Sequence, residues 1–377
     1  MLLDLFKTMI KGFLLDLPTP LNINFWYGLG SMLGLVYCIQ IISGLILSWF
    51  YHVGSEGGFM SVVWIMQDIY GGWLIRFTHS SGVSIFLFLM YLHIMRGLMY
   101  GSFKKVGVWV SGVCILLLSM GAAFLGYVLP WGSMSYWGMT VVTSMLSAVP
   151  MIGGFLVETV WGGSSASVDT LVRFFSFHYI LSLVVMVLVV IHLVMLHEEG
   201  SSNPLGLMGS SEKVVFHGLM SYKDVLGFMG VFILYWIAVF VAPYMLLDPA
   251  NFLEVDFLVT PTHIKPEWYF LFVYCILRST PNKLGGVILM VLAIVMLVFL
   301  SGGSSAGVVR YIGGVYWKWL MVMFVSSFYI LTVLGGCVVE APFEMLGILM
   351  SIIYFMLFIV MLAYKYITDL VGVNIVV

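Results

Sequence analysis

Long apolar runs without charged residues alternate with short polar segments along nearly the whole chain. Each run is long enough to cross a hydrocarbon layer about 30 Å thick as a helix of about 20 residues. The third run contains Pro130 and Pro150, so we expect its spanning helix to end near Leu129 and short surface helices to follow. The pattern therefore predicts an all-α membrane protein with eight transmembrane helices, in the runs 17–55, 77–95, 106–157, 174–197, 225–247, 284–309, 319–339 and 345–364.

The composition agrees with this pattern. Of the 377 residues, 62% are hydrophobic and 8% are charged, which excludes an ordinary soluble domain. Acidic and basic residues interrupt the first 20 positions, so we expect no cleavable signal peptide. The 4 cysteines lie in apolar segments without a C-x-x-C motif, which gives zinc, iron–sulfur clusters and covalently attached haem no support.

Lysine and arginine are unevenly divided between the two sides of the predicted membrane helices. Ten lie on the side of the N-terminus and five on the other side. Because cations are enriched on the cytoplasmic or matrix side, the N-terminus is predicted to lie there. The ten are Lys7, Lys11, Arg96, Lys104, Lys105, Lys213, Lys223, Arg310, Lys318 and Lys365, and the five are Arg76, Arg173, Lys265, Arg278 and Lys283.

The second and fourth predicted helices each carry two histidines fourteen residues apart. Fourteen residues of α-helix rise about 21 Å and return to within about 40° of the same face. Both helices run in the same direction, so His79 pairs in depth with His178, and His93 with His192. Polar groups inside a membrane are costly and are usually functional. The arrangement fits two haems with two histidine ligands each, which suits electron transfer rather than oxygen activation.

Glycines in the first and third predicted helices repeat at the same spacing. Gly30 and Gly44 lie fourteen residues apart, as do Gly112 and Gly126. A position without a Cβ atom lets a haem edge approach a helix closely. With 40 glycines in the chain this match is weak alone, but with the histidines it predicts an N-terminal four-helix bundle that holds two haems.

Three arginines lie near the histidines and close to the helix ends. Arg76 precedes His79 by three residues, and Arg96 follows His93 by three. Arg173 precedes His178 by five residues. Each can reach its interface and bind a haem propionate. The alternative is that these arginines only cap membrane helices. For the histidines, the alternatives are a proton relay or polar pairing between helices.

Seven further motifs extend over nearly the whole chain: Gly126-Tyr-Val-Leu-Pro-Trp-Gly132, Trp137-Gly138, Trp161-Gly-Gly163, Arg173-Phe-Phe, His197-Glu-Glu-Gly-Ser-Ser-Asn-Pro204, Pro266-Glu-Trp-Tyr269 and Arg278-Ser-Thr-Pro-Asn-Lys-Leu-Gly-Gly286. Together they resemble cytochrome b, the membrane core of ubiquinol–cytochrome c reductase (respiratory complex III). The resemblance implies two non-covalent haem b groups, with the low-potential haem on His79 and His178 and the high-potential haem on His93 and His192.

The resemblance also implies an organisation and a location. Residues 1–210 would form the haem bundle with helices of the quinol-oxidation pocket. Residues 211–377 would form a four-span region that carries the Pro-Glu-Trp-Tyr loop. A single eight-span chain with this histidine spacing favours the respiratory form over plastid relatives, and its length favours the mitochondrial inner membrane.

The Pro-Glu-Trp-Tyr segment is assigned by the resemblance to quinol oxidation. Glu267 can accept a proton that the quinol releases, because a carboxylate beside an apolar pocket is a suitable base. Tyr269 would gate or hydrogen-bond the ring, and Pro266 would restrict the turn. The alternative is that Glu267 is a solvated acid paired with Lys265 or Arg278.

Gly138 and Met139, in the segment that follows Pro130, bear on the same predicted pocket. The resemblance places Gly138 against the quinone head group. Met139 follows it where many relatives carry a smaller residue, so we expect an altered pocket shape and inhibitor preference.

A second quinone site is implied on the opposite face, between the fourth and fifth helices. His197 and Asp224 would flank the quinone carbonyls and supply protons during reduction. Ser201 and Lys223 would lie at the same interface. The alternative is interfacial anchoring, which fits Lys223 better than His197.

The resemblance implies an enzyme core that works with partner subunits. Quinol would give one electron to a Rieske iron–sulfur protein and the other to a quinone through the two haems. A cytochrome c-type subunit, other complex III subunits and a second copy would complete a homodimeric complex in the lipid membrane, without nucleic acid. The rival classes are a ferric or oxygen reductase, which needs a nicotinamide–flavin source, and a transporter with inverted repeats.

Overall fold

The computed structural model describes residues 11–53, 57–205, 212–302 and 314–371. Within these ranges, eight helices are long and apolar enough to cross a membrane, as predicted. They are Phe25–Ser48, Gly72–Met99, Val106–Val128, Val168–Glu199, Leu219–Val241, Lys283–Leu300, Val315–Gly336 and Phe343–Ile367. Lys7 and Arg310 lie outside the described residues, and the orientation of the N-terminus stays a prediction.

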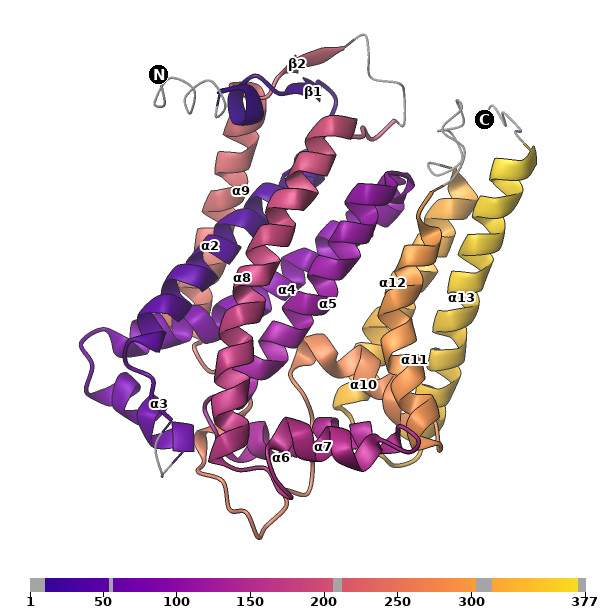
Figure 1. Ribbon diagram of the computed structural model, residues 1–377. Coiled ribbons are helices and arrows are strands. Elements are labelled where there is room, and N and C mark those ends of the chain that lie inside the picture. Colours follow the sequence, from indigo (N-terminus) through magenta and orange to yellow (C-terminus); the bar gives the residue numbers. More distant parts are fainter. Residues whose placement is uncertain (1–10, 54–56, 206–211, 303–313, 372–377) are drawn as a thin grey trace.

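Four of these helices form the N-terminal bundle (Figure 1). They are α2 (Leu29–Ser48), α4 (Gly72–Met99), α5 (Val106–Val128) and α8 (Val168–Glu199). The most extensive packing joins α5 to α8 and α2 to α4. This pairing places the two histidine-bearing helices, α4 and α8, each against a helix that carries the repeated glycines.

The segment after Pro130 forms short helices at one end of the bundle. Helix α5 ends at Val128, and α6 (Ser133–Ser144), the 3-10 turn Met145–Ala148 and α7 (Gly153–Trp161) follow. In Figure 1, α6 and α7 run across the ends of the long helices. The predicted break at the prolines is therefore confirmed. A further short helix, α3 (Gly57–Gln67), connects α2 to α4.

The C-terminal half contains the remaining spans. Helix α9 (Leu219–Trp236), with the π-helix Ile237–Val241, packs against α2 and α4 rather than against the later helices. The others pack mainly on one another. They are α10 (Leu271–Arg278), α11 (Lys283–Val295) with the 3-10 helix Met296–Leu300, α12 (Val315–Gly336) and α13 (Phe343–Val371).

The chain also contains a small antiparallel sheet that the apolar pattern does not predict. Strand β1 (Pro18–Pro20) pairs with β2 (Lys213–Val215). The pair ties the segment before α2 to the connection between α8 and α9, because Pro18 lies opposite Val215.

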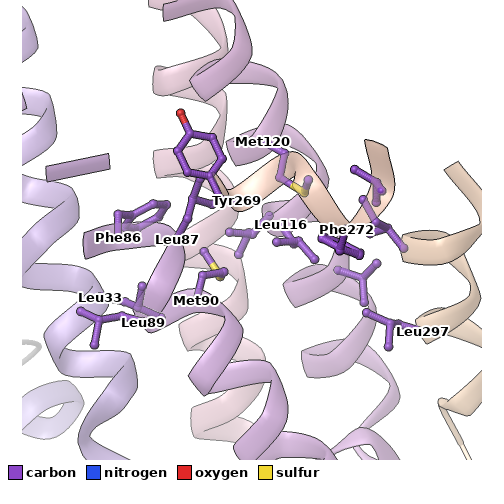
Figure 2. Close-up of a cluster of buried hydrophobic side chains, with 14 of the residues drawn as sticks. Leu33, Phe86, Leu87, Leu89, Met90, Leu116, Met120, Tyr269, Phe272 and Leu297 are labelled. Atoms are coloured by element: carbon purple, nitrogen blue, oxygen red, sulfur yellow. The ribbon is translucent and has the colours of Figure 1, made fainter. Parts of the chain in front are cut away.

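The main buried cluster joins the bundle to the C-terminal helices. Figure 2 shows Leu87 and Met90 of α4, Met120 of α5, Phe272 of α10 and Tyr269 of the predicted quinol-oxidation loop in this cluster. Because lipid is as apolar as these side chains, close packing rather than water exclusion stabilises such a contact. The loop therefore rests on a packed core.

Candidate functional site

The structure brings the four histidines together in the two predicted pairs. The ring centroids of His79 and His178 are 6.2 Å apart, and those of His93 and His192 are 6.4 Å apart. A metal–imidazole bond is about 2 Å long, so each gap accommodates one metal atom between the rings. Among the described residues, no group of three or more histidine, cysteine or acidic side chains could hold a metal ion. Two axial imidazoles without other protein ligands fit haem iron, whose porphyrin supplies the remaining bonds.

The repeated glycines contact the histidine rings themselves. A Cβ atom at Gly126 would lie 2.6 Å from Cε1 of His178, and one at Gly44 would lie 2.8 Å from Cε1 of His79. Gly112 and Gly30 face the second pair at 3.3 and 3.6 Å in the same way. From the sequence, these glycines are expected to admit a haem edge. In the structure they make room for the imidazoles that would bind the haem.

Hydrogen bonds orient three of the four rings. Nδ1 of His178 donates to the carbonyl of Ala122 at 2.8 Å. The Nδ1 atoms of His79 and His192 lie 3.0 and 2.9 Å from the hydroxyls of Ser43 and Ser111. Each hydroxyl also donates to a carbonyl of its own helix, so it accepts from the ring. These bonds leave Nε2 of each ring unprotonated toward its partner, as an iron ligand requires.

Neither serine was predicted as a site residue, although the sequence carries a signal for both. Ser43 directly precedes Gly44, and Ser111 directly precedes Gly112. The repeated unit is therefore Ser-Gly at one position of each glycine helix. Ala122 acts through its backbone carbonyl, so its residue type carried no signal.

Two of the three predicted arginines lie at the histidine pairs. Arg76 lines the cavity at the first pair. Nη2 of Arg96 lies 3.3 Å from Nδ1 of His93, and the buried Nε of Arg96 has no partner among the described residues. An unsatisfied buried guanidinium donor fits a propionate carboxylate. Arg173 instead donates to the carbonyl of Trp161 at 3.4 Å and is not part of the cavity lining, so its predicted role in haem binding stays a prediction.

One cavity of about 840 Å³ joins the first histidine pair to the predicted quinol-oxidation loop. Glu267 and Tyr269 line it together with His79 and His178. Such a volume is typical of a ligand or cofactor site. Pro266 and Gly138 are not part of its lining, but a Cβ atom at Gly138 would meet no atom within 4 Å.

Glu267 is buried rather than solvated. The residue is 9% exposed, and its Oε1 has no hydrogen-bond partner in the part of the chain that the structure describes. Burial, reinforced by the negative charge of Asp248, raises the pKa of Glu267 to about 7, against the lowering effects of Tyr127, Lys265 and Arg76. Carboxyl groups of this kind titrate near neutral pH.

The alternative interpretation of Glu267 is therefore wrong. Lys265 pairs with Asp248 at 3.6 Å, and Arg278 donates to the carbonyl of Cys337 at 2.9 Å. Neither cation forms an ion pair with Glu267 in the described chain.

Helix α4 holds the two residues that directly follow the acid. Nε1 of Trp268 donates to the hydroxyl of Ser84 at 3.1 Å, and the hydroxyl of Tyr91 donates to the carbonyl of Tyr269 at 2.6 Å. Ser84 and Tyr91 lie on the same helix as His79, so the first histidine pair and the buried acid share one support.

Met139 does not line the cavity, in contrast to the expectation that it alters the pocket. It is 1% exposed and packs in a separate cluster with Val128, Tyr136, Leu171 and Phe174. One helical step beyond Gly138 turns the side chain toward this cluster, because neighbouring positions on a helix face about 100° apart.

The predicted second quinone site lies near the ends of α8 and α9. Asp224 accepts a hydrogen bond from Ser31 at 2.5 Å, and a Cβ atom at Gly28 would lie 2.9 Å from its Oδ1. His197 follows His192 by five residues in α8, and Ser201 follows the end of that helix. Lys223 donates to the carbonyl of Ile23 at 2.9 Å, which agrees with an anchoring role.

Comparison with known proteins identifies the family. Residues 14–200 match the family model "Cytochrome b/b6/petB", and residues 254–355 match "Cytochrome b(C-terminal)/b6/petD". A cytochrome b of Leptorhynchoides thecatus is 63% identical over 371 residues, which are 98% of this chain and 100% of the relative. A cytochrome b of Albinaria caerulea is 45% identical over 349 residues, which are 92% of this chain and 95% of the relative.

The fold has a counterpart among solved structures. One chain of "Hyperthermophilic respiratory Complex III" superposes with a TM-score of 0.89 at 29% identity, over 96% of each chain. The eight spans and the paired histidines define a haem-binding membrane protein of electron transport. The chain belongs to the cytochrome b family. It acts in transmembrane electron transfer within a quinol–cytochrome c reductase, as a core subunit of a multi-subunit complex.

Proposed function

We propose that this chain oxidises a quinol, in the manner of ubiquinol, at the cavity beside His79 and His178 and reduces a quinone at the opposite membrane face. The observation that carries the proposal is the single cavity that joins this histidine pair to the buried acid Glu267. A redox group and a proton acceptor beside one cavity are what quinol oxidation requires, because each quinol releases both electrons and protons.

Two haem b groups belong to this proposal, one on His79 and His178 and one on His93 and His192. When bound, each haem supplies a one-electron carrier within the membrane. By resemblance, the first is the low-potential haem and the second the high-potential haem. The Nδ1 hydrogen bonds hold the rings edge-on to the glycine helices, and the spare donor of Arg96 supports a propionate contact.

Glu267 is the proposed proton acceptor for quinol oxidation. With a pKa of about 7, a substantial fraction of the carboxyl is ionised at neutral pH, and the group can accept and later release a proton without a large energetic penalty. Tyr269 and Pro266 would shape the approach of the ring, and the open space beside Gly138 would admit the head group.

His197, Asp224 and Ser201 form the proposed quinone-reduction site. The imidazole and the carboxyl would supply protons to the two carbonyl oxygens of the quinone. Ser31 and Gly28 support this role for Asp224, since Ser31 donates a hydrogen bond to its carboxylate and Gly28 leaves room for its Oδ1.

The remaining proposals concern partners and location. The chain has 4 cysteines and no C-x-x-C motif, so a separate Rieske iron–sulfur protein would take the other electron of the quinol. A cytochrome c-type subunit and a second copy of this chain would complete the complex. The relatives named cytochrome b support the mitochondrial inner membrane, and the excess of lysine and arginine on the side of the N-terminus supports a matrix location for that end.

The test is quinol-driven haem reduction in the purified complex. With the quinone-reduction site blocked by a selective inhibitor, one turnover is expected to reduce haem through the cavity side, and an inhibitor of that side is expected to prevent it. Haem reduction that resists both inhibitors would overturn the proposed pair of sites.

A further inference from the structure

Glu267 needs a route by which its proton leaves the cavity. The residue is buried, and its Oε1 makes no hydrogen bond among the described residues. Because the residue has little exposed surface, a second group nearer the surface would assist the transfer of an accepted proton to bulk water. This inference rests on the proposed role of Glu267 in quinol oxidation.

Asp248 occupies the required position. It lines the same cavity as Glu267, and its side chain is 12% exposed. Its Oδ2 lies 3.6 Å from Nζ of Lys265, whose side chain is 41% exposed. Asp248 therefore shares a cavity with the buried acid and pairs with a lysine that reaches solvent.

The surrounding loop fixes the orientation of Asp248. Its Oδ1 accepts the backbone N–H of Ala250 at 2.9 Å, which leaves Oδ2 for Lys265. The loop is attached to the start of α6, because Oδ1 of Asn251 accepts the N–H of Ser135 at 2.8 Å. A carboxylate held in this way is already oriented for proton transfer.

We propose that Asp248 is the proton-exit residue of the quinol-oxidation site, held in place by Lys265. The quinol hydroxyl gives its proton to the Glu267 carboxylate, and the resulting carboxylic acid gives that proton to the Asp248 carboxylate. Asp248 then releases it to water beside Lys265, and both acids are ionised again. Only protons move in these steps, so no oxidant or reductant is consumed.

Asp248 also affects the ionisation of Glu267. Its negative charge raises the pKa of that carboxyl, whereas Lys265, Arg76 and Tyr127 lower it. Removal of the negative charge should shift the pH midpoint of quinol oxidation downward, and removal of the Lys265 charge should shift it upward. A residue with a purely structural role would not produce these opposite shifts.

The test uses Asp248→Asn in the assembled complex, since an amide oxygen can still accept the Ala250 N–H. We expect haem reduction by quinol to slow about tenfold or more, with the pH midpoint lowered and both haems retained. Lys265→Met should raise the midpoint. The double variant should have a midpoint near that of the unaltered complex but remain slow. Asp256→Asn is the matched control, because Asp256 also accepts a backbone N–H in this connection, at 2.8 Å, but lies outside the cavity lining.

The outcomes separate this inference from the function on which it rests. A normal rate and midpoint in Asp248→Asn, together with slowing in Glu267→Gln, would overturn the exit role alone. A normal rate in Glu267→Gln would overturn the proposed proton acceptor itself. If Asp248→Asn does not assemble, Asp248→Glu and Lys265→Met decide. Retained turnover in Asp248→Glu, together with an upward shift of the pH midpoint in Lys265→Met, supports the exit role. An unchanged pH midpoint in Lys265→Met opposes it.

Discussion

Gly126→Ala is the sharpest test of the contact between the glycine helices and the histidine rings. The added methyl group would lie 2.6 Å from Cε1, 3.0 Å from Nδ1 and 3.3 Å from Nε2 of His178. It would meet the whole edge of the ring, and a ring bonded to the Ala122 carbonyl cannot turn away without losing that hydrogen bond. The imidazole must therefore shift from the position that faces His79.

The expected cost follows from two opposing contributions. Overpacking a tight interior costs about 1–3 kcal/mol, whereas alanine in place of glycine inside a helix gains up to about 1 kcal/mol. The net loss is then up to about 2 kcal/mol, which corresponds to roughly 30-fold weaker retention of a group bound by that ring. Gly121→Ala on the same helix is the matched control. Its methyl group would lie 3.8 Å from Leu181, an ordinary contact, so only the favourable contribution remains.

The assay measures haem retention in the purified complex against an excess of a haem-binding apoprotein. We expect Gly126→Ala to lose the haem of the His79–His178 pair faster than Gly121→Ala, with the second haem retained in both. Equal retention in the two variants would refute the argument that a Cβ atom at Gly126 displaces the ligand ring.

Three further substitutions test other parts of the site. The carboxyl of Glu267 is protonated below its pKa of about 7 and accepts protons only above it, so the native rate of quinol oxidation should rise with pH through this range. Glu267→Gln should abolish this pH dependence of the rate. Stopped-flow measurement of haem reduction tests both expectations. A native rate that falls with pH there would contradict this role. Asp224→Asn should slow reoxidation of the second haem while quinol-driven reduction continues, and normal reoxidation kinetics would remove Asp224 from the reduction site. Met139→Ala should destabilise the complex by about 2–5 kcal/mol, which a lower thermal midpoint would reveal. Inhibitor affinity should not change, since Met139 packs outside the cavity. An altered inhibitor affinity would show that Met139 does shape the pocket.

The sequence was sufficient for features that depend on helical spacing. The fourteen-residue repeats predicted both histidine pairs and the glycines that face them, because rise and rotation along a helix are set by residue number. Pro130 predicted the end of α5 because proline cannot continue a helix interior.

Features that depend on contacts between distant segments were not accessible in the same way. Asp248 lines the same cavity as Glu267 only because the loop before Glu267 folds back on α6. Arg173 is drawn to the Trp161 carbonyl, and Met139 turns into a separate cluster, through packing that no local pattern encodes. Ser43 and Ser111, which accept hydrogen bonds from the histidine rings, could have been predicted from the sequence, because each directly precedes a repeated glycine.

The most direct test of the account is a redox titration of the purified complex by reduced-minus-oxidised absorption spectroscopy. The account predicts two haem b groups per chain that titrate in two separate steps, with His178→Ala removing only one of them. A single haem, or two haems that both survive the loss of His178, would contradict the assignment of one haem to each histidine pair.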